Sequence, residues 1–216
     1  MRTLTLTLLA SILALPAAAQ RRMEHDPDKA VKNGGVLPEG WSARVDRGRP
    51  LDNVNFRKMG NGWHVTLGPA LVLYRSTDRA SDNYTVRASY TQTKAPRHPE
   101  GYGLIVGGSD LAGPNQQYTY FLVRGDGKFL VKRRTGNETS LVSSGWTAND
   151  AIHPQDANGK CTNEVAITVA DGKAKFSING VEVFQADASA LDVDGTYGLR
   201  VNHNLDVHIG KFALEK

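Results

Sequence analysis

The residues best suited to chemistry gather near the end of the chain, in the run NHNLDVH at positions 202–208. Because alternate side chains of a strand share a face, Asp206 and His208 are expected to lie opposite Val207. Imidazole and carboxylate groups at this spacing can ligate a metal ion. The spacing fixes no further strong ligand, and a metal site needs a fuller set. We therefore expect these side chains to form hydrogen bonds, and we assign the chain no metal and no cofactor.

The same alternation predicts a larger polar surface. Arg200 and Asn202 face away from Leu199, and Arg87 faces away from Val86. If the strands involved share one sheet, its concave face gathers six candidate ligand-binding side chains, which are Arg87, Arg200, Asn202, His203, Asp206 and His208. Guanidinium and amide groups can form the hydrogen bonds that sugar hydroxyls or a sugar carboxylate require. The pattern thus predicts a surface that binds a sugar.

Three tyrosines of the predicted strands allow two interpretations. Tyr102, Tyr118 and Tyr120 could offer flat aromatic platforms on which sugar rings stack. Alternatively, each ring packs in the core or at a sheet edge and only its hydroxyl reaches water. For each tyrosine taken singly, packing is the simpler interpretation.

The sequence shows no carboxylate pair of the kind that cleaves glycosidic bonds. Retaining glycosidases need two carboxyl groups about 5–5.5 Å apart. The closest arrangement is the run EHDPD at positions 24–28, which contains a proline and lies outside the predicted strands. Within the predicted strands the acids stand singly, at Glu164, Glu182, Asp206 and Glu215. We therefore assign no catalytic residues.

Short strand patterns succeed one another along the chain, and helical periodicity is nearly absent. Alternating or continuous apolar runs predict the strands 63–67, 70–74, 84–91, 102–106, 118–124, 128–134, 164–170, 173–178, 181–184, 197–201 and 207–209. Gly125-Asp126-Gly127 and Asn179-Gly180 are hairpin-turn sequences. Many short strands at regular spacing favour an all-β fold, an antiparallel β-sandwich or jelly roll, with an up-and-down barrel as the alternative. Its expected core includes Val86, Val165, Ile167, Phe176, Ile178, Leu199, Val201 and Ile209.

The first segment of the chain has the form of a targeting signal. Arg2 precedes a short apolar run, Pro16 ends it, and Ala17-Ala18-Ala19 provides a small-residue cleavage site. We therefore expect a signal peptide over 1–19, a flexible arm over 20–40 and one sandwich domain over 41–216. The mature chain would be periplasmic or secreted, with no transmembrane segment. Cys161 has no partner for a disulfide.

Composition excludes some classes of protein. The chain of 216 residues is 40% hydrophobic and 22% charged, which is ordinary for a globular protein and excludes wholesale disorder. Its formal net charge of +4 is spread along the sequence. A mild, dispersed basic excess does not indicate nucleic-acid binding, so we expect no nucleic-acid partner.

The final third of the chain carries a recognisable motif order. Trp146 is followed by a polar strand from Asn163, a strand ending in Asn179-Gly180, the run GTYGLRV at 195–201 and a last strand with Phe212. This order resembles the concanavalin A-like lectin and glucanase superfamily in its laminin-G-like form. It is also similar to the domain of 3-keto-disaccharide hydrolases. The resemblance implies a jelly roll over roughly residues 40–216.

What the resemblance implies about function remains open among three classes. The first expectation is an exported lectin-like domain that binds a glycan or cell-envelope polymer without cleaving it. The second is a hydrolase of a modified disaccharide or polysaccharide, although the run GYGLIVGG at 101–108 departs from the Asn-Ser-Gly pattern expected for the keto-disaccharide hydrolases. The third is a structural or protein-interaction module.

Overall fold

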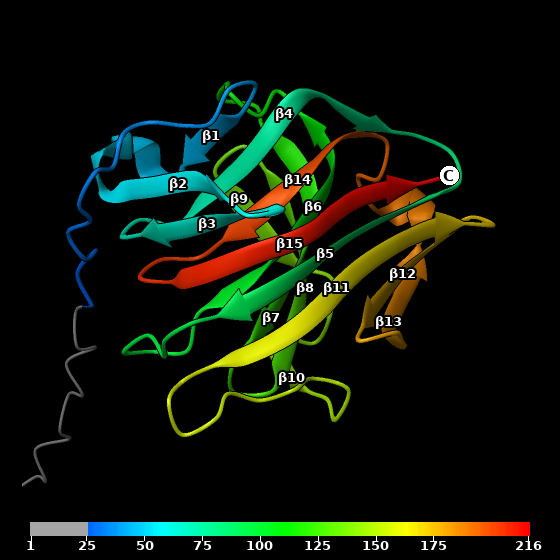
Figure 1. Ribbon diagram of the computed structural model, residues 1–216. Coiled ribbons are helices and arrows are strands. Elements are labelled where there is room, and N and C mark those ends of the chain that lie inside the picture. Colours follow the sequence, from blue (N-terminus) through cyan, green and yellow to red (C-terminus); the bar gives the residue numbers. More distant parts are fainter. Residues whose placement is uncertain (1–25) are drawn as a thin grey trace, which may run out of the picture.

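The protein folds into two antiparallel sheets that pack face to face (Figure 1). The computed structural model describes residues 26–216. The expected signal peptide over 1–19 and the beginning of the expected arm lie outside the described residues. The all-β sandwich is confirmed and the barrel alternative is wrong, because the strands divide between two separate sheets.

Sheet A has eight strands. Along the sheet they are β1 (Ser42–Val45), β4 (Leu71–Ala80), β14 (Gly195–Val201), β6 (Gly101–Ser109), β7 (Gln117–Arg124), β8 (Lys128–Thr135) and β10 (Thr147–Ala148), while β9 (Glu138–Leu141) pairs with β8.

Sheet B has seven strands and lies in front of sheet A in Figure 1. Its order is β13 (Val181–Asp187), β12 (Lys173–Ile178), β11 (Cys161–Ala170), β5 (Tyr84–Gln92), β15 (Asp206–Glu215), β3 (Gly62–Leu67) and β2 (Val54–Met59). Helical structure in the described chain is limited to the short 3-10 turns η1 (Asp46–Gly48), η2 (Leu51–Asn53) and η3 (Ala188–Ala190).

The turn chemistry read from the sequence holds in the structure. Asn179 and Gly180 join β12 to β13 with φ of 51° and 82°. A tight hairpin of this kind needs positive φ at both central residues, which asparagine tolerates and glycine adopts without a steric penalty. The register of this hairpin therefore follows from the sequence.

The core between the sheets contains the side chains that strand periodicity predicted. All eight expected core residues have 0% exposure: Val86, Val165, Ile167, Phe176, Ile178, Leu199, Val201 and Ile209. Tyr102 also belongs to this core. Its hydroxyl lies 3.4 Å from the Cys161 Sγ and accepts a hydrogen bond from the Asn163 amide. Of the two interpretations for Tyr102, packing is correct.

Sheet A also carries an apolar cluster on its outer face. Along β4, Leu71 and Leu73 point into the main core, whereas Val72 and Tyr74 join a second buried cluster. The other members of that cluster are Ile105, Leu111, Tyr118, Tyr120 and Leu122, with Trp146 packed against them. This second cluster explains why residues 70–74 form a continuous apolar run, since the strand is buried on both sides.

The described part of the expected arm lies against the sandwich. The Lys29 ammonium donates to the backbone carbonyls of Asn204 and Leu205, at 3.2 and 3.0 Å. The Asn204 side chain accepts from the Lys29 amide and donates to the Pro27 carbonyl. Farther along, the Gly35 amide donates to the Val54 carbonyl. Hydrogen bonds from residues between 27 and 35 therefore hold this part of the expected arm against the sandwich. None of the described helices is long and apolar enough to cross a membrane.

Candidate functional site

The six residues predicted for one surface are divided between the two sheets. Arg87, Asp206 and His208 lie on β5 and β15 of sheet B, whereas Arg200 lies on β14 of sheet A and Asn202 and His203 follow it. The expectation that these strands share one sheet is wrong. The cause is the pairing: β14 lies between β4 and β6, and β15 lies between β5 and β3.

On sheet B, Arg87 and Asp206 contact residues of the neighbouring strands. The Arg87 guanidinium pairs with Glu164 at 3.2 Å and with Glu215 at 2.8 Å. Asp206 accepts hydrogen bonds from the hydroxyls of Thr66 and Thr93. These contacts link adjacent strands.

The two histidines beside Asp206 belong to the same sheet B surface. His64 Nε2 lies 3.2 Å from the Asp206 carboxylate, and its ring stacks on that of His208 at 6.3 Å. Within residues 26–216, no group of three or more His, Cys, Asp and Glu side chains is placed to hold a metal ion.

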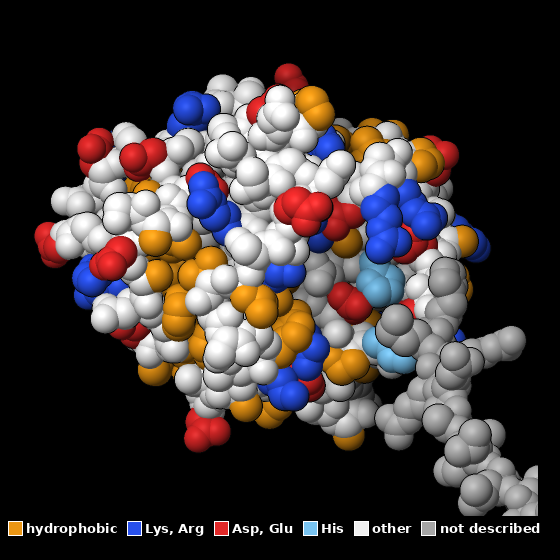
Figure 2. Space-filling view, turned by 180° about the vertical axis from the view of Figure 1, so that it is seen from behind, with side chains coloured by type: hydrophobic (Ala, Val, Ile, Leu, Met, Phe, Trp, Pro, Cys, Tyr) orange, Lys and Arg blue, Asp and Glu red, His pale blue; other side chains and the backbone are white. Residues whose placement is uncertain are grey.

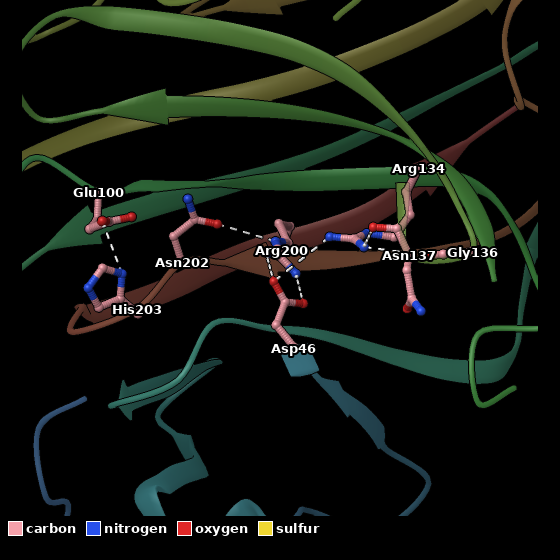
Figure 3. A network of polar contacts seen from close by, with 8 residues as sticks. All are labelled: Asp46, Glu100, Arg134, Gly136, Asn137, Arg200, Asn202 and His203. Atoms are coloured by element: carbon pink, nitrogen blue, oxygen red, sulfur yellow. Dashed lines mark hydrogen bonds and ion pairs between the residues drawn. The ribbon is translucent and has the colours of Figure 1, made fainter. Parts of the chain in front are cut away.

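On sheet A, Arg200 forms the centre of a buried polar network (Figure 3). Its side chain is only 5% exposed and points away from the core that Leu199 and Val201 enter. The guanidinium makes two parallel hydrogen bonds to Asp46, at 2.7 and 2.6 Å, and donates from Nε to Asn202 at 3.3 Å. Burial alone would raise the pKa of Asp46, but the Arg200 hydrogen bonds hold it below its ordinary value. The pair is therefore charged.

Aromatic and basic side chains from the β7–β8 hairpin complete this network. Tyr118 pairs across the strands with Arg134, and Tyr120 pairs with Lys132. The Arg134 guanidinium lies 6.0 Å from the Tyr118 ring centroid and 4.0 Å from the Asp46 carboxylate. Arg200 lies 5.9 Å from the Tyr120 ring centroid. We call the six residues the Arg200 cluster: Asp46, Tyr118, Tyr120, Lys132, Arg134 and Arg200.

For Tyr118 and Tyr120 the packing interpretation is correct as well. They lie on the outer face of sheet A, yet they are only 1% and 6% exposed. Their rings therefore form the floor of this face rather than free platforms. Trp146 is half-buried at the other end of the same cluster, with the Arg124 guanidinium 4.2 Å from its ring centroid. Gly101 leaves room for the Trp146 ring, since a Cβ there would lie 2.8 Å from it.

A cavity of about 600 Å³ opens beside Arg200, which is the size of a small-ligand pocket. We call it the rim cavity. Its lining includes Asp46, Glu100, Arg200, Asn202 and His203, together with residues 26–28. The His203 ring bridges two carboxylates: Nδ1 lies 3.0 Å from Glu100 and Nε2 lies 3.3 Å from Asp26. Burial raises the pKa of Glu100 above its ordinary value, although His203 opposes the shift.

The polar residues of this region form a row across the sheet. Figure 3 shows His203 and Glu100 at one end, Asn202 and Arg200 in the middle, and Arg134 at the other end. The view from the side of sheet A shows hydrophobic side chains gathered near the middle, with Lys and Arg side chains among them (Figure 2). This surface thus combines apolar area with a row of polar and charged groups.

The fold is an antiparallel β-sandwich, and solved structures of carbohydrate-binding and galectin-like domains resemble this chain. A carbohydrate-binding module, CBM66 from Bacillus subtilis, is 14% identical, with a TM-score of 0.60 over 82% of this chain and 96% of that one. A Bacillus subtilis protein of unknown function with a galectin-like fold is 13% identical, with a TM-score of 0.59 over 87% and 96%. No protein-family model and no curated protein matches the sequence. At these identities the likeness concerns the fold.

Sequence reasoning missed several members of the site. Lys132 and Arg134 alternate with Phe129 and Val131 on a strand that was predicted, so strand parity alone could have placed them on the outer face. Asp46 carries no such signal. It lies in the turn η1 after β1 and is 154 positions from Arg200, so only the tertiary fold brings the two together.

Proposed function

We propose that the protein is an exported, lectin-like domain that binds a glycan or cell-envelope polymer through the Arg200 cluster and the rim cavity. One observation carries the proposal: a buried arginine, held by a carboxylate, lies between an aromatic floor and a cavity of about 600 Å³. Ligand sites use a few fixed polar groups of this kind to orient the molecule that they bind. The resemblance of the fold to a carbohydrate-binding module supports this class.

Asn202 is the residue best suited to test this function. Its side chain is half-buried, lines the rim cavity and accepts a hydrogen bond from Arg200, but it takes no part in the Arg200–Asp46 ion pair. Asn202→Ala should weaken binding of a glycan found on an array by about tenfold, the loss of one good hydrogen bond. Asn137→Ala, an exposed position in the adjacent β8–β9 turn, is the matched control.

The outcomes separate binding from folding. We expect both variants to melt near the wild-type temperature and only Asn202→Ala to lose affinity, measured by calorimetric titration. The proposal is overturned if the wild-type protein retains no glycan on the array, or if Asn137→Ala weakens binding as much as Asn202→Ala.

A hydrolase is the second candidate, because the carboxyl groups of Glu100 and Asp46 both line the rim cavity. Burial raises the pKa of Glu100, whereas Arg200 keeps that of Asp46 low despite its burial. Acid–base pairs in enzymes diverge in this manner. Turnover of 3-keto-glycosides or polysaccharides that Glu100→Gln abolishes while glycan binding persists would establish catalysis. Binding without turnover would leave the protein a lectin.

A further inference from the structure

The Arg200 cluster carries more positive than negative charge. Lys132, Arg134 and Arg200 supply three cations, and Asp46 is the carboxylate among them. Asp46 lies within 2.7 Å of Arg200 through both oxygens but 4.0 Å from Arg134. Across residues 26–216, no carboxylate forms an ion pair with Lys132, and Asp46 alone approaches Arg134. The cluster therefore keeps about two uncompensated positive charges, by formal charge counting.

Several other cations in the described chain are paired with carboxylates. Arg87 is shared by two carboxylates, Arg133 makes two hydrogen bonds to Asp192, and Lys173 lies 2.6 Å from Asp187. The Arg200 cluster differs from these pairs because it holds more cations than carboxylates, on the outer face of sheet A. Arg44 of β1 increases this excess of positive charge, because Arg44 pairs across from Val72 of that face and donates to backbone carbonyls of residues 112 and 113.

The excess of positive charge affects the Lys132 side chain. Its pKa is lowered first by burial and then by the positive charges of Arg134 and Arg200. In addition, the Arg134 Nε is buried without a hydrogen-bond partner among the described residues. An anion near these groups would offset the repulsion between the cations, and partial burial would strengthen its attraction.

We propose that the Arg200 cluster selects glycans that carry an acidic sugar, with the acid group bound at Lys132 and Arg134. This inference rests on the proposed function and narrows its ligand to anionic sugars. A uronic acid carboxylate and a sugar sulfate share the required chemistry. Charge-assisted hydrogen bonds from lysine and arginine recognise both groups.

The test compares three probes of similar length on the full mature chain: an oligogalacturonate, a sulfated dextran oligosaccharide and neutral maltotetraose. Lys132→Gln is the test variant. Lys175→Gln is its control, since it makes the same change of net charge on β12 of sheet B. We expect calorimetry to show an acidic probe binding at least about tenfold more tightly than the neutral one, and Lys132→Gln to remove that preference.

The possible results distinguish this inference from the proposed function. A preference for the uronate or for the sulfate, lost only in Lys132→Gln, supports the inference and identifies the acid group. Equal losses in the two lysine variants would show a general attraction to polyanions and overturn it. Neutral binding that depends on Asn202 but shows no acidic preference would overturn this inference and leave the proposed function standing. Binding of neutral array glycans alone would likewise overturn this inference and leave the proposed function standing. If no glycan binds, both the inference and the proposed function are wrong.

Discussion

At the residue scale, the Asp46–Arg200 pair joins the turn after β1 to the centre of sheet A. Removing one member of a buried pair leaves the other charge without compensation, which typically costs about 3–5 kcal/mol. We predict that Asp46→Ala lowers the free energy of unfolding by about 3 kcal/mol, the lower end because Asp46 is partly exposed. Urea unfolding followed by circular dichroism measures the change.

The control for Asp46 is an ion pair of similar length in solvent. Asp187 lies 2.6 Å from Lys173, but both side chains are exposed, and surface pairs contribute little. Asp187→Ala should leave the unfolding midpoint almost unchanged. Equal effects of Asp46→Ala and Asp187→Ala would show that the Arg200 pair contributes nothing beyond a surface contact.

Asp206 gives the protein a predictable response to acid. Its pKa is held well below the ordinary value, first by the hydrogen bond from His64 and further by those from Thr93 and Thr66. A carboxyl group with a depressed folded-state pKa stabilises the fold above its unfolded pKa of about 3.9, and that contribution is lost as the pH falls further. We predict that Asp206→Asn lowers the melting temperature at pH 6, and that the difference from wild type shrinks below about pH 4.

Scanning calorimetry of both proteins between about pH 6 and pH 2 tests this behaviour. The remaining carboxyl groups are common to the two proteins, so their titration cancels in the difference. A gap in melting temperature that stays constant down to the lowest pH would contradict a depressed pKa at Asp206.

Half of the candidate site could be predicted from the sequence. Strand parity placed Arg200 on the face opposite Leu199. The prediction assigned its chain neighbours Asn202 and His203 to the same surface. Parity also placed Arg87 correctly on a face away from Val86, but it contains no information about which sheet a strand joins. The sheet that a strand joins depends on long-range pairing. Asp46 could not be predicted for the same reason, because only the tertiary fold brings it to Arg200.

At the element scale, the β12–β13 hairpin shows how one side chain joins the two sheets. Phe176 is fully buried, and its ring lies 5.3 Å from Phe121 of sheet A and 5.8 Å from Phe184 of β13, centroid to centroid. We predict that Phe176→Ala costs about 3–5 kcal/mol in the free energy of unfolding, through lost burial and a cavity. Urea unfolding monitored by tryptophan fluorescence measures the loss.

Val181→Ala on the same hairpin is the matched control, because Val181 is 53% exposed. Its effect should stay within about 0.5 kcal/mol, as for most surface substitutions. A cost below about 1 kcal/mol for Phe176→Ala would mean that the ring does not bridge the sheets, since a buried Phe truncation costs several times more.

The strands themselves were predictable where the alternation of side chains was long. β5 and β12 alternate between buried and less buried residues throughout, as their sequences indicate. Shorter strands escaped prediction: β1, β9 and β10 have four residues or fewer, and β2 is polar over its second half. Such segments become strands because a neighbouring strand offers backbone hydrogen bonds, a property of the assembled sheet.

At the scale of the whole molecule, we predict that the exported chain begins at Gln20. The positive start, the short apolar run and the Ala17–Ala19 spacing are typical of a signal peptide. Mass spectrometry of protein secreted or released from the periplasm should show the N-terminus at Gln20. Ala19→Arg should block cleavage and Ala14→Leu should not. Cytoplasmic retention of the wild-type chain with Met1 intact would contradict export.

The positions of β14 and β15 set the order in which the molecule can be completed. These last two strands in the sequence are interior strands, because β14 separates β4 from β6 and β15 separates β5 from β3. Until residues 195–215 leave the ribosome, each layer has a gap in its interior. About half of the strand pairings, including all four of β14 and β15, join segments far apart in the sequence, and such pairings form slowly. We therefore expect nascent chains to remain unfolded until residues 195–215 have been synthesised, which suits a protein that would cross a membrane before folding.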